Sequence, residues 1–220
     1  MATSLDLQEQ EQLDSLKAFW KQYGNAITWL LILLLGAYAG WNGWQYWQRD
    51  QAIKASAMFD ELDRSVQSGD AERTARVFQD LQSRYGGTVQ AAQGGLLAAR
   101  LQSDKGQADA ARATLSWVAE KAGDEGLRTL ARLRLAGLML EAKQLDEALK
   151  QLEAATAPGF EALVADRRGD VLLAKGDKAG AKAAFESAWR AMPPQLDYRR
   201  LVEAKLTALG GAPAAPEVAK

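Results

Sequence analysis

Hydrophobic and polar positions divide the chain into two parts that meet near residue 49. Between Lys21 and Arg49 no residue is charged, and the centre of this stretch, residues 27–39, reads ITWLLILLLGAYA. A surface helix of a globular protein shows polar residues every three or four positions, and this stretch does not. At about 1.5 Å per residue, residues 27–46 reach about 30 Å, the thickness of a hydrocarbon core. The pattern predicts one membrane-spanning helix over residues 23–48, preceded by a short arm, residues 1–22.

Aromatic and small residues add detail to this predicted helix. Five of the seven tryptophans lie between Trp20 and Trp47, and aromatic rings near both ends of a span settle at the level of the lipid headgroups. The expected interfacial anchors are Trp20, Tyr23, Trp41, Trp44 and Trp47. A stripe of small residues offers close approach to a second helix, although such residues are also common by chance in membrane helices. It consists of Gly36, Ala39, Gly40 and Gly43.

Two alternatives to a permanent membrane helix follow from the same stretch. One is a buried helix of a soluble core. The other is a cleaved signal peptide, because Ala37-Tyr38-Ala39 fits a small-x-small cleavage pattern. The arm argues against the signal peptide, since it carries four acids and two lysines where a signal peptide has a short basic segment. Basic residues near the helix are almost balanced between its two sides, so the charge count leaves the topology open.

From residue 51 onward the pattern is helical and repeats. The segment is rich in Ala, Leu, Arg, Glu and Gln and contains no alternating strand-like stretch. Gly169, Leu172, Gly176, Ala181 and Phe185 follow the spacing of the tetratricopeptide signature. Equivalent positions recur at 74, 111, 148 and 181, close to the roughly 34-residue norm. The expected fold is all-α, with about four stacked helix pairs over residues 49–209; an irregular helical bundle is the alternative.

Each predicted pair has a small residue where its helices cross, a large one filling the gap, and a turn between the helices. The turns are expected at Gly69, Gly106, Lys143 and Gly176. The positions that pack the repeats are Phe78, Ala111, Leu115, Ala148, Leu152, Gly169, Ala181 and Phe185. Residues 196–209 predict a capping helix, and the Gly/Pro/Ala-rich residues 210–220 predict a disordered tail.

Composition and charge narrow the possible functions. The chain has no cysteine and no histidine, which excludes disulfides, thiol nucleophiles, Cys/His zinc sites and triads that need histidine. A net charge of -1 disfavours nucleic-acid binding. The acid pairs Asp124-Glu125 and Asp146-Glu147 fall at predicted helix starts or turns, where acids favour the helix dipole. No phosphate-binding loop is present. We therefore expect no enzyme activity, no metal and no cofactor.

The first helices of the pairs are expected to line a concave groove that binds protein. Its expected lining mixes apolar and charged side chains, which suits an extended peptide or a partner helix. The residues are Leu96, Arg100, Leu130, Leu133, Arg134, Leu163, Asp166, Asp170 and Leu173. The alternative is that these residues pack against the C-terminal helix.

Three segments carry a resemblance to a known family. They are LKAFWKQYGN at residues 16–25, Gly40-Trp41 with Tyr46-Trp47, and VADRRGDVLLAKGDK at residues 164–178. They resemble the YfgM-type ancillary subunits of the SecYEG protein translocon. The resemblance implies a single-pass protein of the bacterial inner membrane with a cytoplasmic N-terminal arm and a periplasmic repeat domain. It also implies association with the translocon and with a membrane-anchored periplasmic chaperone of the peptidyl-prolyl isomerase type, and it carries over no catalytic residue.

Two functional hypotheses follow. The first is an adaptor that links the translocon to periplasmic chaperones and helps to handle translocating polypeptides. The second is a scaffold of another cell-envelope assembly, such as the cell-division or wall machinery.

Overall fold

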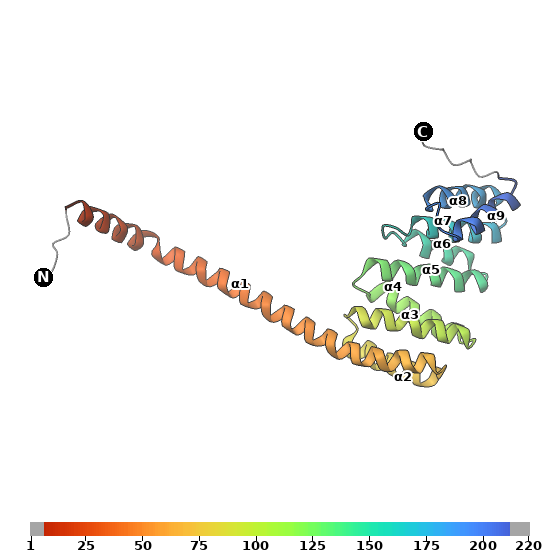
Figure 1. The fold of residues 1–220 in the computed structure, drawn as a ribbon, viewed down its shortest axis with the longest axis horizontal. Helices are drawn as coiled ribbons and strands as arrows, with labels where there is room; N and C mark the ends of the chain where they lie inside the picture. The colour runs from red at the N-terminus through yellow and green to blue at the C-terminus, as the bar shows by residue number, and fades with distance from the viewer. Residues whose placement is uncertain (1–6, 212–220) are drawn as a thin grey trace. The chain divides into compact units, whose positions relative to one another are not determined.

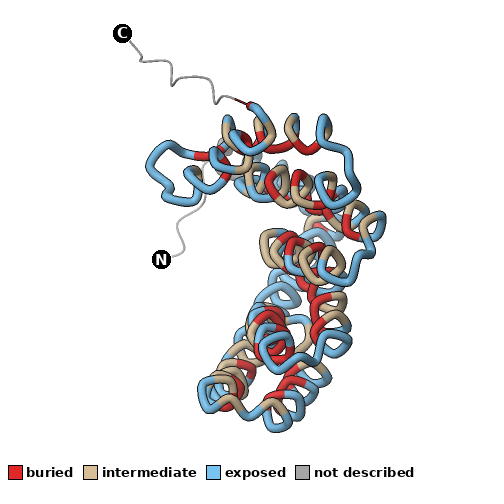
Figure 2. Tube along the Cα trace, turned by 90° about the vertical axis from the view of Figure 1, so that its right-hand side faces the viewer, coloured by how far each residue is buried: buried red, intermediate tan, exposed pale blue. Residues whose placement is uncertain are grey.

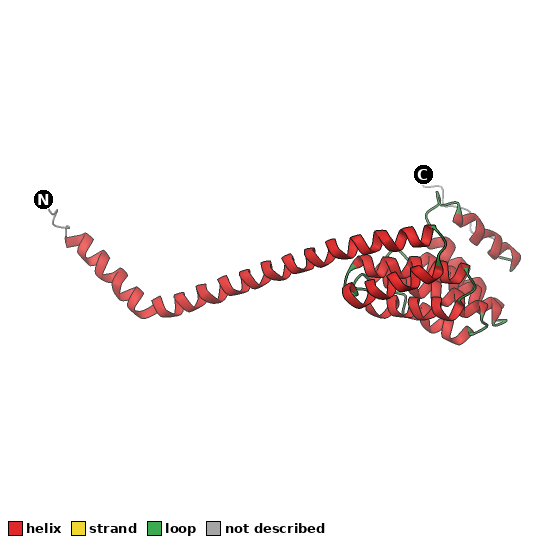
Figure 3. Ribbon diagram, turned by 90° about the horizontal axis from the view of Figure 1, so that it is seen from below, coloured by secondary structure: helices red, strands yellow, loops and turns green. Residues whose placement is uncertain are grey.

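The fold is entirely helical within residues 7–211, the part of the chain that this computed structural model describes (Figure 3). The chain divides into two compact units, Met1–Asp50 and Gln51–Lys220. The division falls inside the first helix, α1, which runs from Leu7 to Gln67. The all-α prediction is confirmed.

The first unit is the part of α1 up to Asp50 (Figure 1). By length and composition α1 is able to cross a membrane, and only 6% of its most apolar window is buried. Large side chains such as Trp29 and Leu33 are 66% and 68% exposed. Thr28 and Asn42 donate to the carbonyls of Gly24 and Tyr38, so their polar groups are satisfied within the helix. A core helix would be covered by protein, so the buried-helix alternative does not fit the described residues.

The second unit is a stack of helix pairs. The end of α1 pairs with α2, α3 with α4, α5 with α6, and α7 with α8, and α9 follows. From α2 onward each helix contacts the next, and α5 also contacts α3 and α7 (Figure 1). Four pairs and a capping helix are therefore confirmed. The bounds are α2 Ala71–Tyr85, α3 Val89–Asp104, α4 Ala108–Lys121, α5 Glu125–Glu141, α6 Leu145–Glu153, α7 Glu161–Ala174, α8 Lys178–Ala191 and α9 Tyr198–Ala208.

The turns inside the four pairs share one geometry. In each, a left-handed residue ends the first helix, and the next residue donates its backbone N–H to a carbonyl five residues earlier, a Schellman cap. The left-handed residues are Gly69, Gly106, Lys143 and Gly176, with φ of 68°, 73°, 58° and 87°. The donors Asp70, Gln107, Gln144 and Asp177 lie 3.1, 2.8, 2.8 and 3.0 Å from their acceptors. Glycine adopts this conformation freely, whereas a residue with a Cβ, here Lys143, is strained by roughly 1 kcal/mol.

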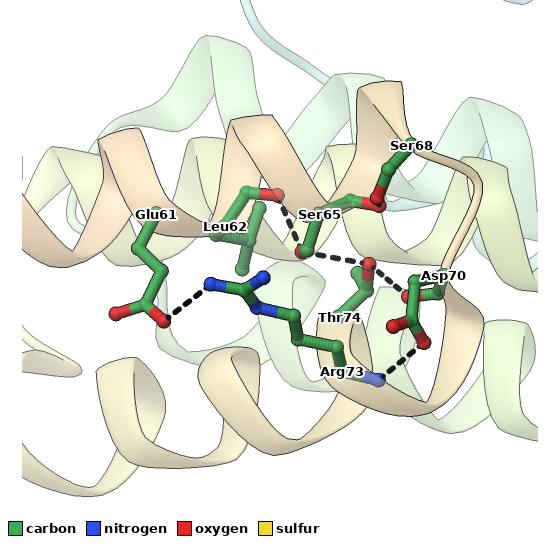
Figure 4. Close-up of polar contacts among 7 residues, drawn as sticks. All are labelled: Glu61, Leu62, Ser65, Ser68, Asp70, Arg73 and Thr74. Carbon is green, nitrogen blue, oxygen red and sulfur yellow. Dashed lines mark hydrogen bonds and ion pairs between the residues drawn. The ribbon is translucent and has the colours of Figure 1, made fainter.

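The first pair is joined by buried hydroxyl groups (Figure 4). The hydroxyl oxygens of Ser65 on α1 and Thr74 on α2 lie 2.8 Å apart, and each is also within hydrogen-bond distance of a carbonyl, that of Leu62 for Ser65 and that of Asp70 for Thr74. One hydroxyl therefore donates to the other, and the second donates to its carbonyl. At the surface Arg73 pairs with Glu61 at 3.1 Å. The three later pairs have alanine at the Thr74 position, so only the first crossing uses hydrogen bonds in place of close alanine packing.

The core follows the repeat positions (Figure 2). Gly169 shows why a small residue is needed, because an added Cβ would lie 2.6 Å from Cδ1 and 2.8 Å from Cζ of the Phe185 ring. All eight residues expected to pack the repeats are buried: Phe78, Ala111, Leu115, Ala148, Leu152, Gly169, Ala181 and Phe185. At the end of the domain Gly210 and Gly211 donate to carbonyls of α9. The rest of the predicted disordered tail, residues 212–220, lies outside the described part, as does the start of the arm.

Candidate functional site

A groove runs over α3, α5, α7 and α9. It consists of two neighbouring clefts of about 300 and 350 Å³ that are both lined by Arg134 and Leu138. Its lining residues are Ala99, Arg100, Ser103, Asp104, Leu130, Leu133, Arg134, Gly137, Leu138, Glu141, Leu163, Asp166, Arg167 and Tyr198. We call this set the groove. Both apolar and charged side chains reach it, as expected for a surface that binds peptide.

Six of the nine residues expected in the groove line it: Arg100, Leu130, Leu133, Arg134, Leu163 and Asp166. The other three lie elsewhere. Leu96 is buried in the core between α3, α4 and α5, Asp170 is bound by a lysine of α9, and Leu173 is exposed outside the groove. Leu96, Leu133 and Asp166 occupy equivalent repeat positions and are all buried, because this position faces inward on each helix.

The capping helix α9 binds two of the acids of α7, Asp166 and Asp170. Asp166 is only 2% exposed and accepts hydrogen bonds from the Tyr198 hydroxyl at 2.7 Å and from Lys205 Nζ at 2.8 Å. The same Nζ lies 2.8 Å from Asp170 Oδ1. Burial, followed by the hydrogen bond to Asp166, raises the pKa of Tyr198 to about 12. A buried carboxylate requires such partners. For Asp166 and Asp170, the alternative of packing against the C-terminal helix therefore holds.

Arg134 has a different environment. Its Nη1 donates to the Leu96 carbonyl at 2.9 Å, and no carboxylate within residues 7–211 lies at ion-pair distance from it. Partial burial and the neighbouring Arg100 lower the pKa of Arg134. Arg100 reaches only Asp104, at 3.9 Å, and both side chains are largely exposed. The groove therefore presents two arginines from neighbouring repeats, of which Arg134 has no carboxylate at ion-pair distance among the described residues.

Some groove residues were not expected from the sequence. Arg167 stands one 33-residue step after Arg134, and Gly137 one 37-residue step after Arg100, so extending the repeat register would have found both. Leu138 and Glu141 lie further along α5 on the same side. Tyr198 lies outside the repeats, and no periodic signal pointed to it.

The acid pairs have structural roles. Asp124 accepts the backbone N–H of Leu127 at 2.8 Å and caps α5. Asp146, in the first turn of α6, binds Lys175 at the end of α7 at 2.6 Å, and this hydrogen bond lowers the pKa of the Asp146 carboxyl. Among the described residues, no group of three acidic side chains is arranged to hold a metal ion.

The residues expected to pack against another helix or to anchor α1 at the membrane surface are exposed. An added Cβ at Gly36, Gly40 or Gly43 would meet no atom within 4 Å, and Ala39 is exposed beside them. The five aromatic anchors, Trp20, Tyr23, Trp41, Trp44 and Trp47, are each about half exposed or more. Within the described part of α1, these faces remain available to lipid or to another helix.

Comparison with known proteins identifies the family. The family described as Tetratricopeptide repeat-like domain matches residues 17–211. Three relatives carry the name Ancillary SecYEG translocon subunit. The Haemophilus influenzae protein is 35% identical, covering 83% of this chain and 89% of its own; the Escherichia coli protein is also 35% identical, covering 81% and 86%. The Neisseria gonorrhoeae protein is 30% identical, covering 92% and 98%.

No solved structure matches the chain significantly. The resemblance seen in residues 16–25 and 164–178 is confirmed by these relatives, whose matches extend over most of the chain. The protein belongs to the tetratricopeptide repeat-like family and, within it, to the ancillary SecYEG translocon subunits.

Proposed function

We propose that this protein is a membrane-anchored adaptor of the SecYEG translocon. One observation carries the proposal. The chain combines a helix whose apolar side chains are exposed with a repeat domain whose groove is lined by apolar and charged groups. The names of the relatives point to the translocon as the assembly. Binding rather than catalysis fits the groove, since its one buried acid, Asp166, is neutralised by Tyr198 and Lys205.

The proposed topology places the N-terminal arm in the cytoplasm, the helix in the inner membrane and the repeat domain in the periplasm. The chain has no cysteine, so single cysteines report topology without background. Gln12→Cys and Ala113→Cys lie at exposed positions of the arm and of α4. In spheroplasts, a membrane-impermeant maleimide should label Ala113→Cys at once and Gln12→Cys only after permeabilisation. The reverse pattern would show a cytoplasmic repeat domain and refute the proposal.

The same preparations test the signal-peptide alternative. Intact-mass analysis of the membrane-bound protein should give the full chain, because the proposed function requires the helix to remain attached. A measured mass that corresponds to a chain beginning at Gly40 would show that the helix is cleaved off, and the protein would then lack its membrane anchor.

The proposed partner of the groove is a membrane-anchored periplasmic chaperone of the peptidyl-prolyl isomerase type, or a translocating polypeptide. Photocrosslinking amino acids at Gly40, in the open stripe, and at Leu138, in the groove, test the two surfaces separately. We expect translocon subunits from Gly40 and the chaperone or emerging polypeptides from Leu138. Position Ala113, exposed on α4 outside the groove, is the control. Recovery of cell-division or wall proteins instead would favour the scaffold hypothesis.

A further inference from the structure

Both clefts of the groove are lined by Arg134 on α5, and one of them is also lined by Arg100 on α3, in the preceding repeat. The Leu96 carbonyl fixes one nitrogen of the Arg134 guanidinium, which leaves its other N–H groups to donate elsewhere. Burial, and after it the positive charge of the neighbouring Arg100, lower the pKa of Arg134, so the charged form of Arg134 carries an electrostatic cost. An anion bound between the two arginines would offset that cost.

The acids of this region do not supply that anion. Asp166 is bound by Tyr198 and Lys205, and Asp170 lies 2.8 Å from Lys205 and 3.8 Å from Arg167. Glu141 lies seven residues after Arg134, about 10 Å along the helix axis. The exposed contact of Asp104 with Arg100, at 3.9 Å, contributes little in water.

Leucines lie beside Arg134 in the groove. Leu130, Leu133 and Leu138 of α5 and Leu163 of α7 line the cleft that contains Arg134, and Gly137 leaves space between them. A free phosphate or a lipid headgroup would use the arginines and leave these leucines exposed. A peptide with an acidic residue beside apolar ones would use both, because it would bury its apolar side chains while its carboxylate meets the cations.

We propose that the groove binds an extended peptide segment in which Asp or Glu is flanked by apolar residues. The carboxylate lies between Arg100 and Arg134, and the apolar side chains lie against Leu130, Leu138 and Leu163. This inference deepens the proposed function and rests on its premise that the groove binds protein. It specifies which segment of a partner or of a translocating polypeptide the groove selects.

The test uses the full chain in phosphatidylcholine nanodiscs. The probes are two soluble fluorescein-labelled peptides, one with Glu placed among Leu and Ser residues and one with Gln in place of every Glu. Fluorescence anisotropy should show at least about ten-fold tighter binding of the Glu peptide, since a hydrogen bond to a charged group contributes about 1.5–3 kcal/mol. Arg134→Gln should remove this preference and leave the affinity for the Gln peptide nearly unchanged.

Two further variants make the result specific. Arg84→Gln removes an exposed positive charge from the end of α2, away from the groove, and should keep the full preference. Gly137→Leu places a side chain in the groove and should weaken the binding of both peptides. Circular dichroism confirms that each variant is folded before binding is measured.

Equal affinity of the wild-type protein for the two peptides would overturn the inference, as would a preference that survives in Arg134→Gln. Displacement of the Glu peptide by phosphatidylglycerol vesicles, but not by phosphatidylcholine vesicles, would identify a lipid as the occupant and also overturn it. Co-purification with translocon subunits separates this outcome from the adaptor proposal. If the wild-type protein does not co-purify, the adaptor proposal fails; if it does co-purify but shows no peptide selectivity, only the present inference fails.

Discussion

Replacing Gly169 by alanine tests the packing that defines the last repeat. The new Cβ would lie 2.6 and 2.8 Å from two atoms of the Phe185 ring, and that ring is fully buried. An ordinary contact requires a shift of the ring of nearly 1 Å, and overpacking of a tight core costs about 1–3 kcal/mol, occasionally more. The better helix propensity of alanine returns about 1 kcal/mol. With the cost of the clash at the upper end of its range, we expect the free energy of unfolding to fall by about 2 kcal/mol.

Gly137→Ala is the matched control, since it makes the same chemical change within another first helix of a pair. Its Cβ would meet only the end of the Arg167 side chain, at 3.9 Å. Nothing opposes the gain in helix propensity there, so this variant should gain up to about 1 kcal/mol. The double variant Gly169→Ala/Phe185→Leu should lose less stability than the sum of the losses of the two single variants, because the smaller leucine side chain leaves room for the new methyl group.

The assay is thermal unfolding of the full chain in detergent, followed by far-ultraviolet circular dichroism, with hydrogen exchange of peptides from α7 and α8. For a domain of this size, a loss of about 2 kcal/mol lowers Tm by about 4–8 °C, and the control should raise it by about 2–4 °C. The loss of protection should be concentrated in α7 and α8. If Gly169→Ala stabilises the protein as much as Gly137→Ala does, then α7 and α8 do not pack as the structure has them.

Four further predictions follow from the turns, the cap and the membrane helix. Lys143→Gly should stabilise the repeat domain by up to about 1 kcal/mol in thermal unfolding, because it relieves the left-handed strain, whereas Lys143→Ala should not. Lys205→Met should destabilise it by about 3 kcal/mol in thermal unfolding, since it leaves the buried Asp166 without its charged partner. In the wild-type protein, the Tm of the repeat domain should fall at alkaline pH. The pKa of Tyr198 is raised, so its contribution to stability is complete below its ordinary value of about 10 and is lost as pH rises through about 12. Leu33→Arg should reduce the carbonate-resistant membrane fraction, because a central arginine opposes insertion by about 2.5–3.5 kcal/mol, whereas Leu33→Ile should not.

The features that could be predicted from the sequence were those that repeat or that form a long run. The uncharged stretch between Lys21 and Arg49 predicted the membrane-competent part of α1 because a hydrocarbon core demands uniform apolarity over its whole thickness. The repeat spacing predicted the turn at Lys143 even without a glycine there, because the register with Gly106 and Gly176 fixed its place. In both cases several positions carried the same signal.

The features that escaped prediction depend on single contacts between segments. Gly94 and Gly95 showed no chemical motif, yet an added Cβ at Gly94 would lie 2.8 Å from Leu81, and one at Gly95 would lie 3.1 Å from Phe78. Gly94 lets α3 approach α2 closely, and Gly95 does the same for both α2 and α4, because an added Cβ there would also lie 2.5 Å from Val118 of α4. Tyr198 on α9 could not be assigned to the groove, because a helix outside the repeat has no register to show which face it covers.

The cap and the groove together explain how charge is distributed in the repeat domain. A terminal repeat needs a cover for its open face, and α9 covers α7 with side chains that bind Asp166 and Asp170. The cap therefore supplies the partners of these two acids from within the domain. Had Asp166 been free, it would have supplied a carboxylate to the same groove as Arg134. Because it is engaged, Arg134 has no carboxylate at ion-pair distance among the described residues, so a domain that is nearly neutral as a whole keeps a locally uncompensated cation in the groove. A partner peptide would recognise this local imbalance of charge rather than the net charge of the domain.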